Sequence, residues 1–311
     1  MRPGRVVLVG PPGDAQVRAV TRALGGRAEL LDVSALAHGE PFTLDPARPP
    51  LPAAVYVRAL PSTFPPLRPG ADGRALVAER WLTPFMLARE RADVVTGLLL
   101  EWHARGVRLL NPPGPGGFAQ NKLQQLLCGQ RLGVPLPRTR VTNDPAAARA
   151  FIRRHRQVIA KPASGGALAR VVGPREPLHA LRASPVILQE RIPGDDVRLF
   201  LLGGRVLSCR ALRLPGAPVV DFRGSAAYQA GRATYEPVRL PADIRRAAVA
   251  WARANGLVLA GVDLRRTPRG RLVFLECNSS PIWLDQEEKT GDSVTAAVAA
   301  WLAPAPTGRS S

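Results

Sequence analysis

Hydrophobic and polar positions divide the chain into two parts with different patterns. In the first part, short apolar runs alternate with stretches of helical spacing. The runs that predict strands are Val6–Val9, Ala53–Leu60 and Val107–Leu110, and the helical stretches are Ala15–Leu24 and Arg74–Arg105. Strands that alternate with helices predict an α/β domain. A proline- and glycine-rich segment begins at Asn111, so we place the first domain boundary there.

The second part contains more strands and fewer helices. Helices are predicted over Asn121–Leu132, from Pro145 after the cap signal Asn143-Asp144, over Asp243–Asn255 and over Ser293–Leu302. Strands are predicted around Arg138–Val141 and over Val158–Lys161, Val186–Ile192, Arg198–Leu214, Val258–Arg265 and Arg271–Asn278. The tail, residues 304–311, is expected to be mobile.

The last two predicted strands form a hairpin with polar side chains near its end. With a loop over Thr267–Gly270, Asp263 lies opposite Phe274, and Glu276 is its diagonal neighbour at roughly 7–8 Å. Because side chains alternate between the faces of a strand, Glu276 and Asn278 share one face. Three oxygen-bearing side chains are therefore expected to converge.

This convergence predicts a metal site. Two carboxylates that lie close together repel each other unless a cation lies between them. Mg²⁺ prefers oxygen ligands and usually binds one or two carboxylates together with substrate phosphates. Asp263, Glu276 and Asn278 are thus candidate ligands for Mg²⁺ or Mn²⁺. The alternative is a solvated polar rim on the hairpin.

Two of the three lysines stand where a phosphate site needs a compact cation. Lys161 ends a predicted strand just before the glycine pair Gly165-Gly166, and Lys122 opens a predicted helix. An ammonium group on a flexible stem can follow phosphate oxygens, and glycine lets backbone N–H groups approach them. A surface charge is the alternative for each lysine alone.

The segment "ILQERIPGDDVRLF" offers a third binding element. A strand edge presents backbone N–H and C=O groups that can hold an adenine ring. An acidic group two or three residues past the turn at Ile192-Pro-Gly194 can hold ribose hydroxyls. The alternative is an ordinary turn with an aspartate cap.

Composition narrows the class of protein. The 311 residues carry a net charge of +19, and lysine occurs only at 122, 161 and 289 among the 43 basic residues. This skew indicates a mutational bias toward arginine codons, and a polyanionic partner is the alternative. Basic residues are spread along the chain and aromatic content is 5%, which disfavours nucleic-acid binding.

Other features argue against further classes. The three cysteines are scattered without CxxC spacing, which argues against a disulfide framework and a zinc site. No apolar stretch approaches the roughly 20 residues of a membrane span. The apolar run near the N-terminus is too short for a signal peptide, so we expect a cytoplasmic protein.

Taken in order, six segments resemble the RimK-like carboxylate–amine ligases of the ATP-grasp superfamily. The segments are "NKLQQLLCGQRLGVPLPRT", "VIAKPASGG", "LQERIPGDDVRLFLLGGRVLSCRALR", "DFRGS", "GVDLRRTPRGRLVFLECNSSP" and "EEKTG", and they cover roughly Asn111 to Leu302. The resemblance implies an ATP-grasp fold, in which two α+β subdomains grip ATP, here preceded by an α/β domain. The implied limits are 1–112 for the N-terminal domain, 113–187 for the central subdomain and 188–303 for the C-terminal subdomain.

The same resemblance implies a role for each matching residue. Lys122 and Lys161 contact ATP phosphates, and Asp263, Glu276 and Asn278 bind Mg²⁺. Adenine is held by Gln189, Glu190, Arg191 and Ile192, and ribose by Asp196. Arg223, in "DFRGS", faces the transferred phosphate, and with Lys161 it is expected to act in catalysis. Ser225 departs from the asparagine that the family often has.

The resemblance implies an ATP-dependent ligase that forms an amide bond through an acyl phosphate. Its substrates are a carboxylate and an amine, on an amino acid or a peptide, and an acidic peptide is one candidate. Two alternatives use the same ATP site: a ligase that closes lactone or lactam rings on a ribosomal peptide, and a kinase of a polyphosphorylated alcohol. A basic binding protein without enzymatic activity is a third alternative. We expect no membrane or nucleic-acid partner, and a second copy of the chain is a candidate partner in a homo-oligomer.

Overall fold

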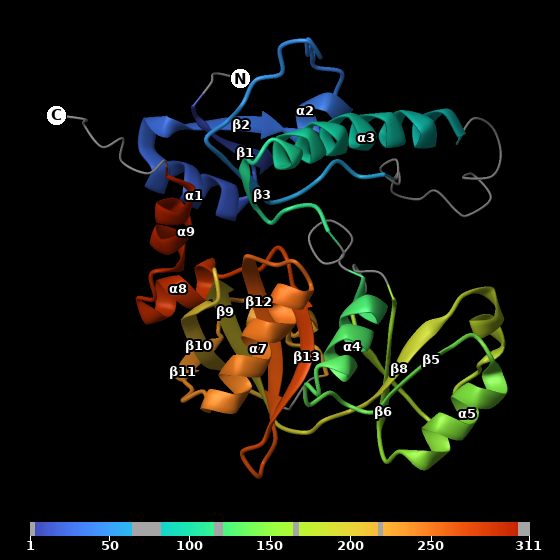
Figure 1. Cartoon of the computed structure of the whole chain (residues 1–311). Helices are drawn as coiled ribbons and strands as arrows, with labels where there is room; N and C mark the ends of the chain where they lie inside the picture. The colour runs from blue at the N-terminus through green and yellow to red at the C-terminus, as the bar shows by residue number, and fades with distance from the viewer. Residues whose placement is uncertain (1–3, 64–81, 115–120, 164–167, 217–219, 304–311) are drawn as a thin grey trace. The chain divides into compact units, whose positions relative to one another are not determined.

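The structure is a computed structural model that describes residues 4–63, 82–114, 121–163, 168–216 and 220–303. The chain forms two compact units, one made of Met1–Pro113 with Thr295–Ser311, the other of Gly114–Val294. The first unit has one sheet and the second has two (Figure 1), and buried hydrophobic residues lie in both units. The predicted glycine pair Gly165-Gly166 and the predicted mobile tail lie outside the described residues.

The first unit contains a parallel sheet of order β2-β1-β3-β4. Its elements are β1 (Val6–Gly10), α1 (Ala15–Leu24), β2 (Ala28–Asp32), α2 (Val33–Ala37), β3 (Ala54–Val57), α3 (Leu82–Ala104) and β4 (Arg108–Leu110), with α9 (Val294–Leu302) near the end of the chain. Asp14 begins α1 by accepting hydrogen bonds from the backbone N–H groups of Gln16 and Val17. Arg108 donates to the carbonyls of Trp301 and Ala303, which ties the end of α9 to β4.

The second unit contains two sheets. The smaller one has the order β5-β8-β6-β7 and is antiparallel. Its elements are α4 (Lys122–Arg131), β5 (Thr139–Thr142), α5 (Pro145–Arg154), β6 (Val158–Lys161), β7 (Arg170–Val172) and β8 (Val186–Glu190). Helix α5 packs Ala148, Phe151 and Ile152 against this sheet.

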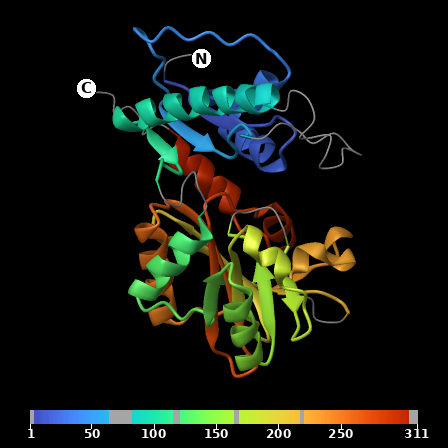
Figure 2. The ribbon, with the colours of Figure 1, turned by 90° about the vertical axis from the view of Figure 1, so that its right-hand side faces the viewer.

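The larger sheet has the order β11-β10-β9-β12-β13 (Figure 2 gives a second view). Its elements are β9 (Asp195–Leu202), β10 (Arg205–Arg213), α6 (Ala226–Gln229), β11 (Thr234–Pro237), α7 (Ala242–Ala254), β12 (Leu259–Arg266), β13 (Leu272–Asn278) and α8 (Leu284–Thr290). Trp251 of α7 is fully buried against Phe274 of β13, with ring centroids 5.7 Å apart. Its indole N–H donates to the carbonyl of Gln125, which fixes α4 to α7.

The register of the β12–β13 hairpin differs from the prediction. Asp263 lies opposite Glu276 and not opposite Phe274. The loop takes in one more residue than expected, Arg271, and a bulge at Leu275 adds a second. Beyond the bulge the total shift is two residues, so Glu276 and Asn278 stay on the predicted face, the face of Asp263. Before the bulge the shift is one residue, so Leu272, Val273 and Phe274 lie on the opposite face from the one predicted.

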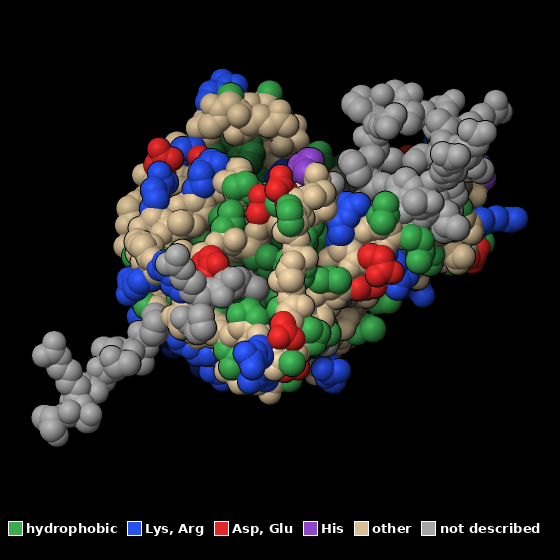
Figure 3. Space-filling view, turned by 90° about the horizontal axis from the view of Figure 1, so that it is seen from above, with side chains coloured by type: hydrophobic (Ala, Val, Ile, Leu, Met, Phe, Trp, Pro, Cys, Tyr) green, Lys and Arg blue, Asp and Glu red, His purple; other side chains and the backbone are tan. Residues whose placement is uncertain are grey.

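The sequence also missed several short elements, among them β2, α2, α6, β11 and α8. In the described residues, no helix is long and apolar enough to cross a membrane. On the face seen in Figure 3, Lys and Arg side chains are scattered among acidic and apolar ones and form no single continuous patch.

Candidate functional site

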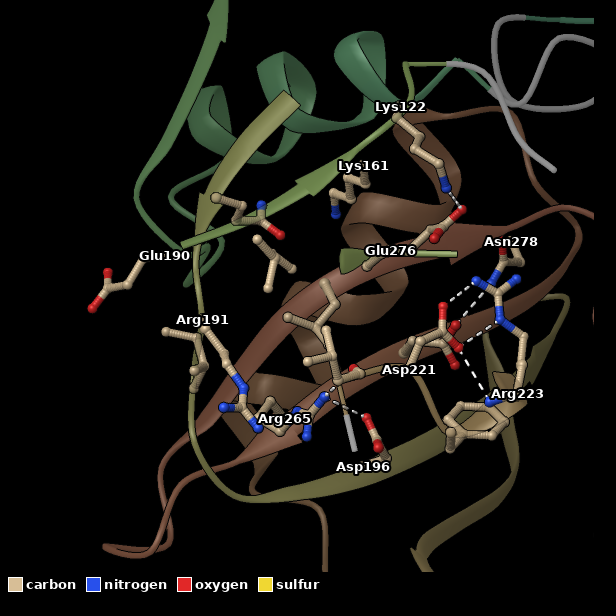
Figure 4. Close-up of a pocket in the computed structure, with 18 of the residues that line it drawn as sticks. Lys122, Lys161, Glu190, Arg191, Asp196, Asp221, Arg223, Arg265, Glu276 and Asn278 are labelled. Atoms are coloured by element: carbon tan, nitrogen blue, oxygen red, sulfur yellow. Dashed lines mark hydrogen bonds and ion pairs between the residues drawn. The ribbon is translucent and has the colours of Figure 1, made fainter. Parts of the chain in front are cut away.

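A cleft in the second unit brings all of the predicted site residues together (Figure 4). One wall comes from the smaller sheet and the other from the larger sheet. The predicted residues that line it are Lys122, Lys161, Gln189, Glu190, Arg191, Ile192, Asp196, Arg223, Asp263, Glu276 and Asn278. The cleft is also lined by three charged residues that the sequence analysis did not single out: Arg198, Asp221 and Arg265.

The carboxylate side of the cleft is built by the β12–β13 hairpin. Asp263 and Glu276 face each other directly across the ladder, and Asn278 Nδ2 donates to Asp263 Oδ2 at 2.9 Å. Burial raises the pKa of Asp263, and neighbouring Glu276 adds to this effect while Arg198 opposes it. Two carboxylates and an amide thus stand together where a cation would relieve their repulsion.

Arg198 is the partner of Asp263 on the neighbouring strand. The two residues are directly opposite in the β9–β12 ladder, and Arg198 Nε lies 3.1 Å from Asp263 Oδ1. The guanidinium also lies over the ring of Phe222, 5.3 Å from its centroid. Arg198 therefore orients the aspartate from the neighbouring strand, and it lines the cleft itself.

A second charge pair lies two residues further along the same ladder. Asp196 is opposite Arg265, and their side chains are 2.9 Å apart. Burial raises the pKa of Asp196 to about 6, although Arg265 opposes the shift. Arg265 also donates to the carbonyl of Gly194 at 3.0 Å, so it ties Asp196 to the turn before β9.

Arg198 and Arg265 could have been found from the sequence. Arg198 is two residues after Asp196, and Arg265 is two residues after Asp263. Side chains two apart share a face of a strand, so each arginine had to point the same way as a predicted site residue.

The lysines differ in their partners. Lys122, the first residue of α4, forms an ion pair with Glu276 across the cleft. Lys161, the last residue of β6, has no ion-pair partner within the described part of the chain. Burial lowers the pKa of Lys161 to about 8, against the opposing attraction of Glu276.

Arg223 projects from a short 3₁₀ turn at Phe222–Gly224. Its guanidinium binds both oxygens of Asp221, with Nε–Oδ1 at 2.9 Å and Nη2–Oδ2 at 2.6 Å. This bidentate pair raises the pKa of Arg223 and fixes the direction of its side chain. Ser225 is occupied structurally, because its Oγ accepts from the backbone N–H of Tyr228 and begins α6.

The end of β8 forms the predicted adenine side. Gln189 is almost fully buried and donates through Nε2 to Thr139 Oγ1 at 2.9 Å. Arg191 donates to Gln157 Oε1 at 2.8 Å.

The "EEKTG" segment forms the end of α8, where Lys289 pairs with Asp285 at 2.7 Å.

The donor set fits Mg²⁺ with a nucleotide better than a metal held by protein alone. Within the described residues, no group of three or more His, Cys, Asp or Glu side chains gathers in a way that could hold a metal ion. Mg²⁺ needs only one or two carboxylates when phosphates complete its shell. Asp263, Glu276 and Asn278 could supply that share.

Comparisons with known proteins identify the family. A family model described as the RimK-like ATP-grasp domain matches residues 119–302. A probable alpha-L-glutamate ligase of Marinobacter nauticus is 31% identical over 220 residues, which cover 66% of this chain and 70% of that protein. Probable alpha-L-glutamate ligase 2 of Shewanella amazonensis is 40% identical over 120 residues, and the match spans only 38% of either protein.

Solved structures match over almost the whole chain. The ATP-grasp ligase PsnB complexed with minimal precursor has a TM-score of 0.80 and 26% identity, and the match covers 96% of this chain and 98% of that one. PsnB with a phosphomimetic variant of minimal precursor, Mg and ADP has a TM-score of 0.81 and 25% identity, with coverage of 97% and 98%. The mixed α/β architecture is thus the predicted ATP-grasp fold, and because the family model matches more than half of the chain, this protein belongs to the RimK-like ATP-grasp family of ligases.

Proposed function

We propose that this protein uses Mg-ATP to activate a substrate carboxylate as an acyl phosphate and then joins it to an amine. The observation that carries the proposal is the meeting of Lys122, Lys161 and Arg223 with the carboxylates Asp263 and Glu276 in one cleft. Cations that face a triphosphate and carboxylates that hold its metal are the parts that phosphoryl transfer needs.

The residues of the chain contribute by binding and positioning. ATP supplies the phosphoryl group that gives the carboxylate a leaving group, and Mg²⁺ neutralises phosphate charge. Lys122 and Lys161 bind phosphate oxygens, while Asp263, Glu276 and Asn278 hold the metal. Asp221 orients the Arg223 guanidinium, which binds the oxygens of the phosphate that is transferred.

The ribose and adenine roles are also part of this proposal. Asp196 accepts from the ribose hydroxyls, and Arg265 keeps its carboxylate in place. The backbone between Glu190 and Ile192 binds the adenine edge, because the Gln189 side chain is already engaged with Thr139.

A second candidate is the closure of lactone or lactam rings on a peptide. PsnB, whose solved complexes contain a precursor peptide, matches 96–97% of this chain, N-terminal domain included. A groove between the β9–β10 turn and α7 also favours a peptide. It is lined by Arg205, Arg245, Arg246 and Arg253, and none of the four has an acidic partner in the described residues. Such a groove suits an acidic segment of a peptide substrate.

One screen tests these candidates together. ADP release is measured with amino acids, acidic peptides and polyphosphates, with Glu276→Ala as the control, and the products are analysed by mass spectrometry. An amide between two molecules supports the first candidate, loss of one water per ring from a peptide supports the second, and a phosphorylated product would make the protein a kinase. ADP release that survives in Glu276→Ala would contradict the metal assignment.

A further inference from the structure

Lys122 and Glu276 form an ion pair, and hydrogen bonds of neighbouring residues fix the backbone on both sides of it. Lys122 is the first residue of α4, and the side chain of Asn121 fixes that helix end by accepting from Gln124 N at 3.0 Å. The buried Gln125 accepts from the backbone N–H of Cys277 at 3.1 Å through Oε1, and so links α4 to the residue after Glu276. The pair is therefore held by its scaffold and is not a chance contact between two flexible surface chains.

Both side chains of the pair are largely shielded from water. The exposed fraction is 13% for the Lys122 side chain and 22% for the Glu276 side chain. A charge-assisted hydrogen bond in such a place is stronger than an exposed one, because water screens it less. A metal ion that binds Glu276 Oε1 has to displace the ammonium group first.

The partner of the other carboxylate does not compete in this way. Arg198 binds only Asp263 Oδ1, from the neighbouring strand, and its guanidinium is stacked over Phe222. It can remain in place while a cation binds at Asp263 Oδ2, whose present partner is the neutral amide of Asn278. Lys122 also lines the cleft, but its flexible stem lets the ammonium move to another acceptor.

Nucleotide phosphates are such an acceptor. They carry more negative charge than one carboxylate, so their arrival draws Lys122 away from Glu276. The oxygen that is released then faces a metal ion brought by the same phosphates. Metal and nucleotide thereby favour each other's binding, and by linkage the effect is equal in both directions.

We propose that Lys122 is an exchangeable counter-ion of Glu276, which makes the protein bind a divalent metal strongly only together with a nucleotide. This inference rests on the nucleotide site of the proposed function. Lys122 then has two roles. It binds phosphate when the nucleotide is present, and without the nucleotide its ion pair with Glu276 competes with metal binding.

The test uses Mn²⁺ as the probe, with free Mn²⁺ followed by electron paramagnetic resonance in the absence and presence of ADP. In the wild-type protein, ADP is expected to tighten Mn²⁺ binding by about tenfold or more. Lys122→Met keeps the apolar stem but removes the charge, so Mn²⁺ alone should bind about tenfold more tightly than in the wild type. The coupling between Mn²⁺ and ADP should then fall toward one.

Two further variants keep the result interpretable. Lys289→Met removes another ion-paired lysine, whose partner is Asp285, and should behave like the wild type. Glu276→Gln removes the ligand itself, so adding Lys122→Met to it should no longer tighten Mn²⁺ binding. Thermal unfolding of each variant checks that the fold is retained.

Two results would overturn the inference. One is Mn²⁺ binding by the wild type that is equally tight with and without ADP. The other is a folded Lys122→Met variant whose affinity for Mn²⁺ alone equals that of the wild type. Binding of ADP is measured in parallel: when ADP binds, either result overturns the inference alone and the proposed function stands. A wild-type protein that binds no ADP would contradict the proposed function as well.

Discussion

The two walls of the cleft differ in how their charges are paired. On the larger sheet, Asp263 pairs with Arg198 and Asp196 pairs with Arg265, each across the β9–β12 ladder. On the smaller sheet, Lys161 has no ion-pair partner in the described residues, and burial holds its pKa down at about 8. The carboxylates of the larger sheet are therefore already oriented by their arginine partners. The positive charge of Lys161 on the smaller sheet is left for a ligand to neutralise.

This difference separates two kinds of charged residue. The register of the strands fixes the position of a paired charge, so such a residue contributes by holding its partner in one orientation. An unpaired buried charge is unfavourable for the protein alone and is relieved by a bound anion. Four predictions test whether this distinction holds.

The largest effect is expected at the metal ligand. Glu276→Gln keeps the shape of the side chain but removes the charge, and should lower Mg²⁺-dependent ADP release by about 100-fold or more. The matched control is Glu288→Gln, an exposed glutamate on α8 that should retain full activity. Equal ADP release from the two variants would show that the paired carboxylates do not hold the metal.

The charge of the unpaired Lys161 should contribute to the affinity for ATP. Lys161→Met should raise KM for ATP about tenfold, since one phosphate contact is lost. Because burial lowers the pKa of Lys161 to about 8 from 10.5, wild-type affinity for ATP should fall as pH rises through about 8. Lys161→Arg stays charged, so its KM for ATP should change less over the same pH range, and identical pH profiles would contradict this account.

The groove lined by Arg205, Arg245, Arg246 and Arg253 contains a second set of unpaired cations. Changing Arg246 and Arg253 together to alanine should raise KM for an acidic peptide substrate roughly three- to fivefold, because exposed ion pairs are weak. KM for ATP should stay the same, since the groove is separate from the residues that line the cleft. Added salt should weaken peptide binding in the wild type more than in the variant. Loss of ATP binding instead would mean that the change disturbs the fold.

The smallest effect on function is expected at a paired charge outside the cleft. Asp292 accepts from Ser208 Oγ at 2.5 Å and forms an ion pair with Arg210. Burial acts to raise its pKa, but the hydrogen bonds from Arg210 and Ser208 outweigh this and bring the pKa to about 2, below the ordinary 3.8. The stabilisation is therefore present above pH 4 and is lost as pH falls toward 2.

Asp292→Asn should accordingly lower the free energy of unfolding by about 1 to 2 kcal/mol at pH 7. The difference from the wild type should shrink as pH falls from 4 to 2, as measured by denaturant unfolding. Activity at neutral pH should be retained. A difference that grows with acidity would have the wrong sign for this ion pair.

The sequence predicted the faces of the site residues better than their partners. Alternation along β13 placed Glu276 and Asn278 together whatever the register, which is why a two-residue error left the site intact. The loop residue Arg271 and the bulge at Leu275 could not be read from the pattern, because an extra residue in a strand leaves no hydrophobic signal. The ion pairs across β9 and β12 depend on which strands are neighbours, and a linear pattern does not give that order.

Short elements were the other omission. Strand β2 has only one buried residue, Leu31, so its pattern lacks the apolar run that marks β1. Helix α8 follows Trp283 with mostly polar residues and only one turn or two of length, too short for helical periodicity to emerge. The domain limits remain a prediction, and the variants above test the proposed roles of individual residues.

The central claim is that Asp263 and Glu276 together hold a divalent metal that carries a nucleotide. Crystals grown with Mn²⁺ and ADP, with data collected near the manganese absorption edge, test it most directly. The account predicts an anomalous peak bound by carboxylate oxygens of both residues, with Lys122 turned from Glu276 toward phosphate. A peak bound elsewhere, with Lys122 still paired to Glu276 beside bound ADP, would contradict it.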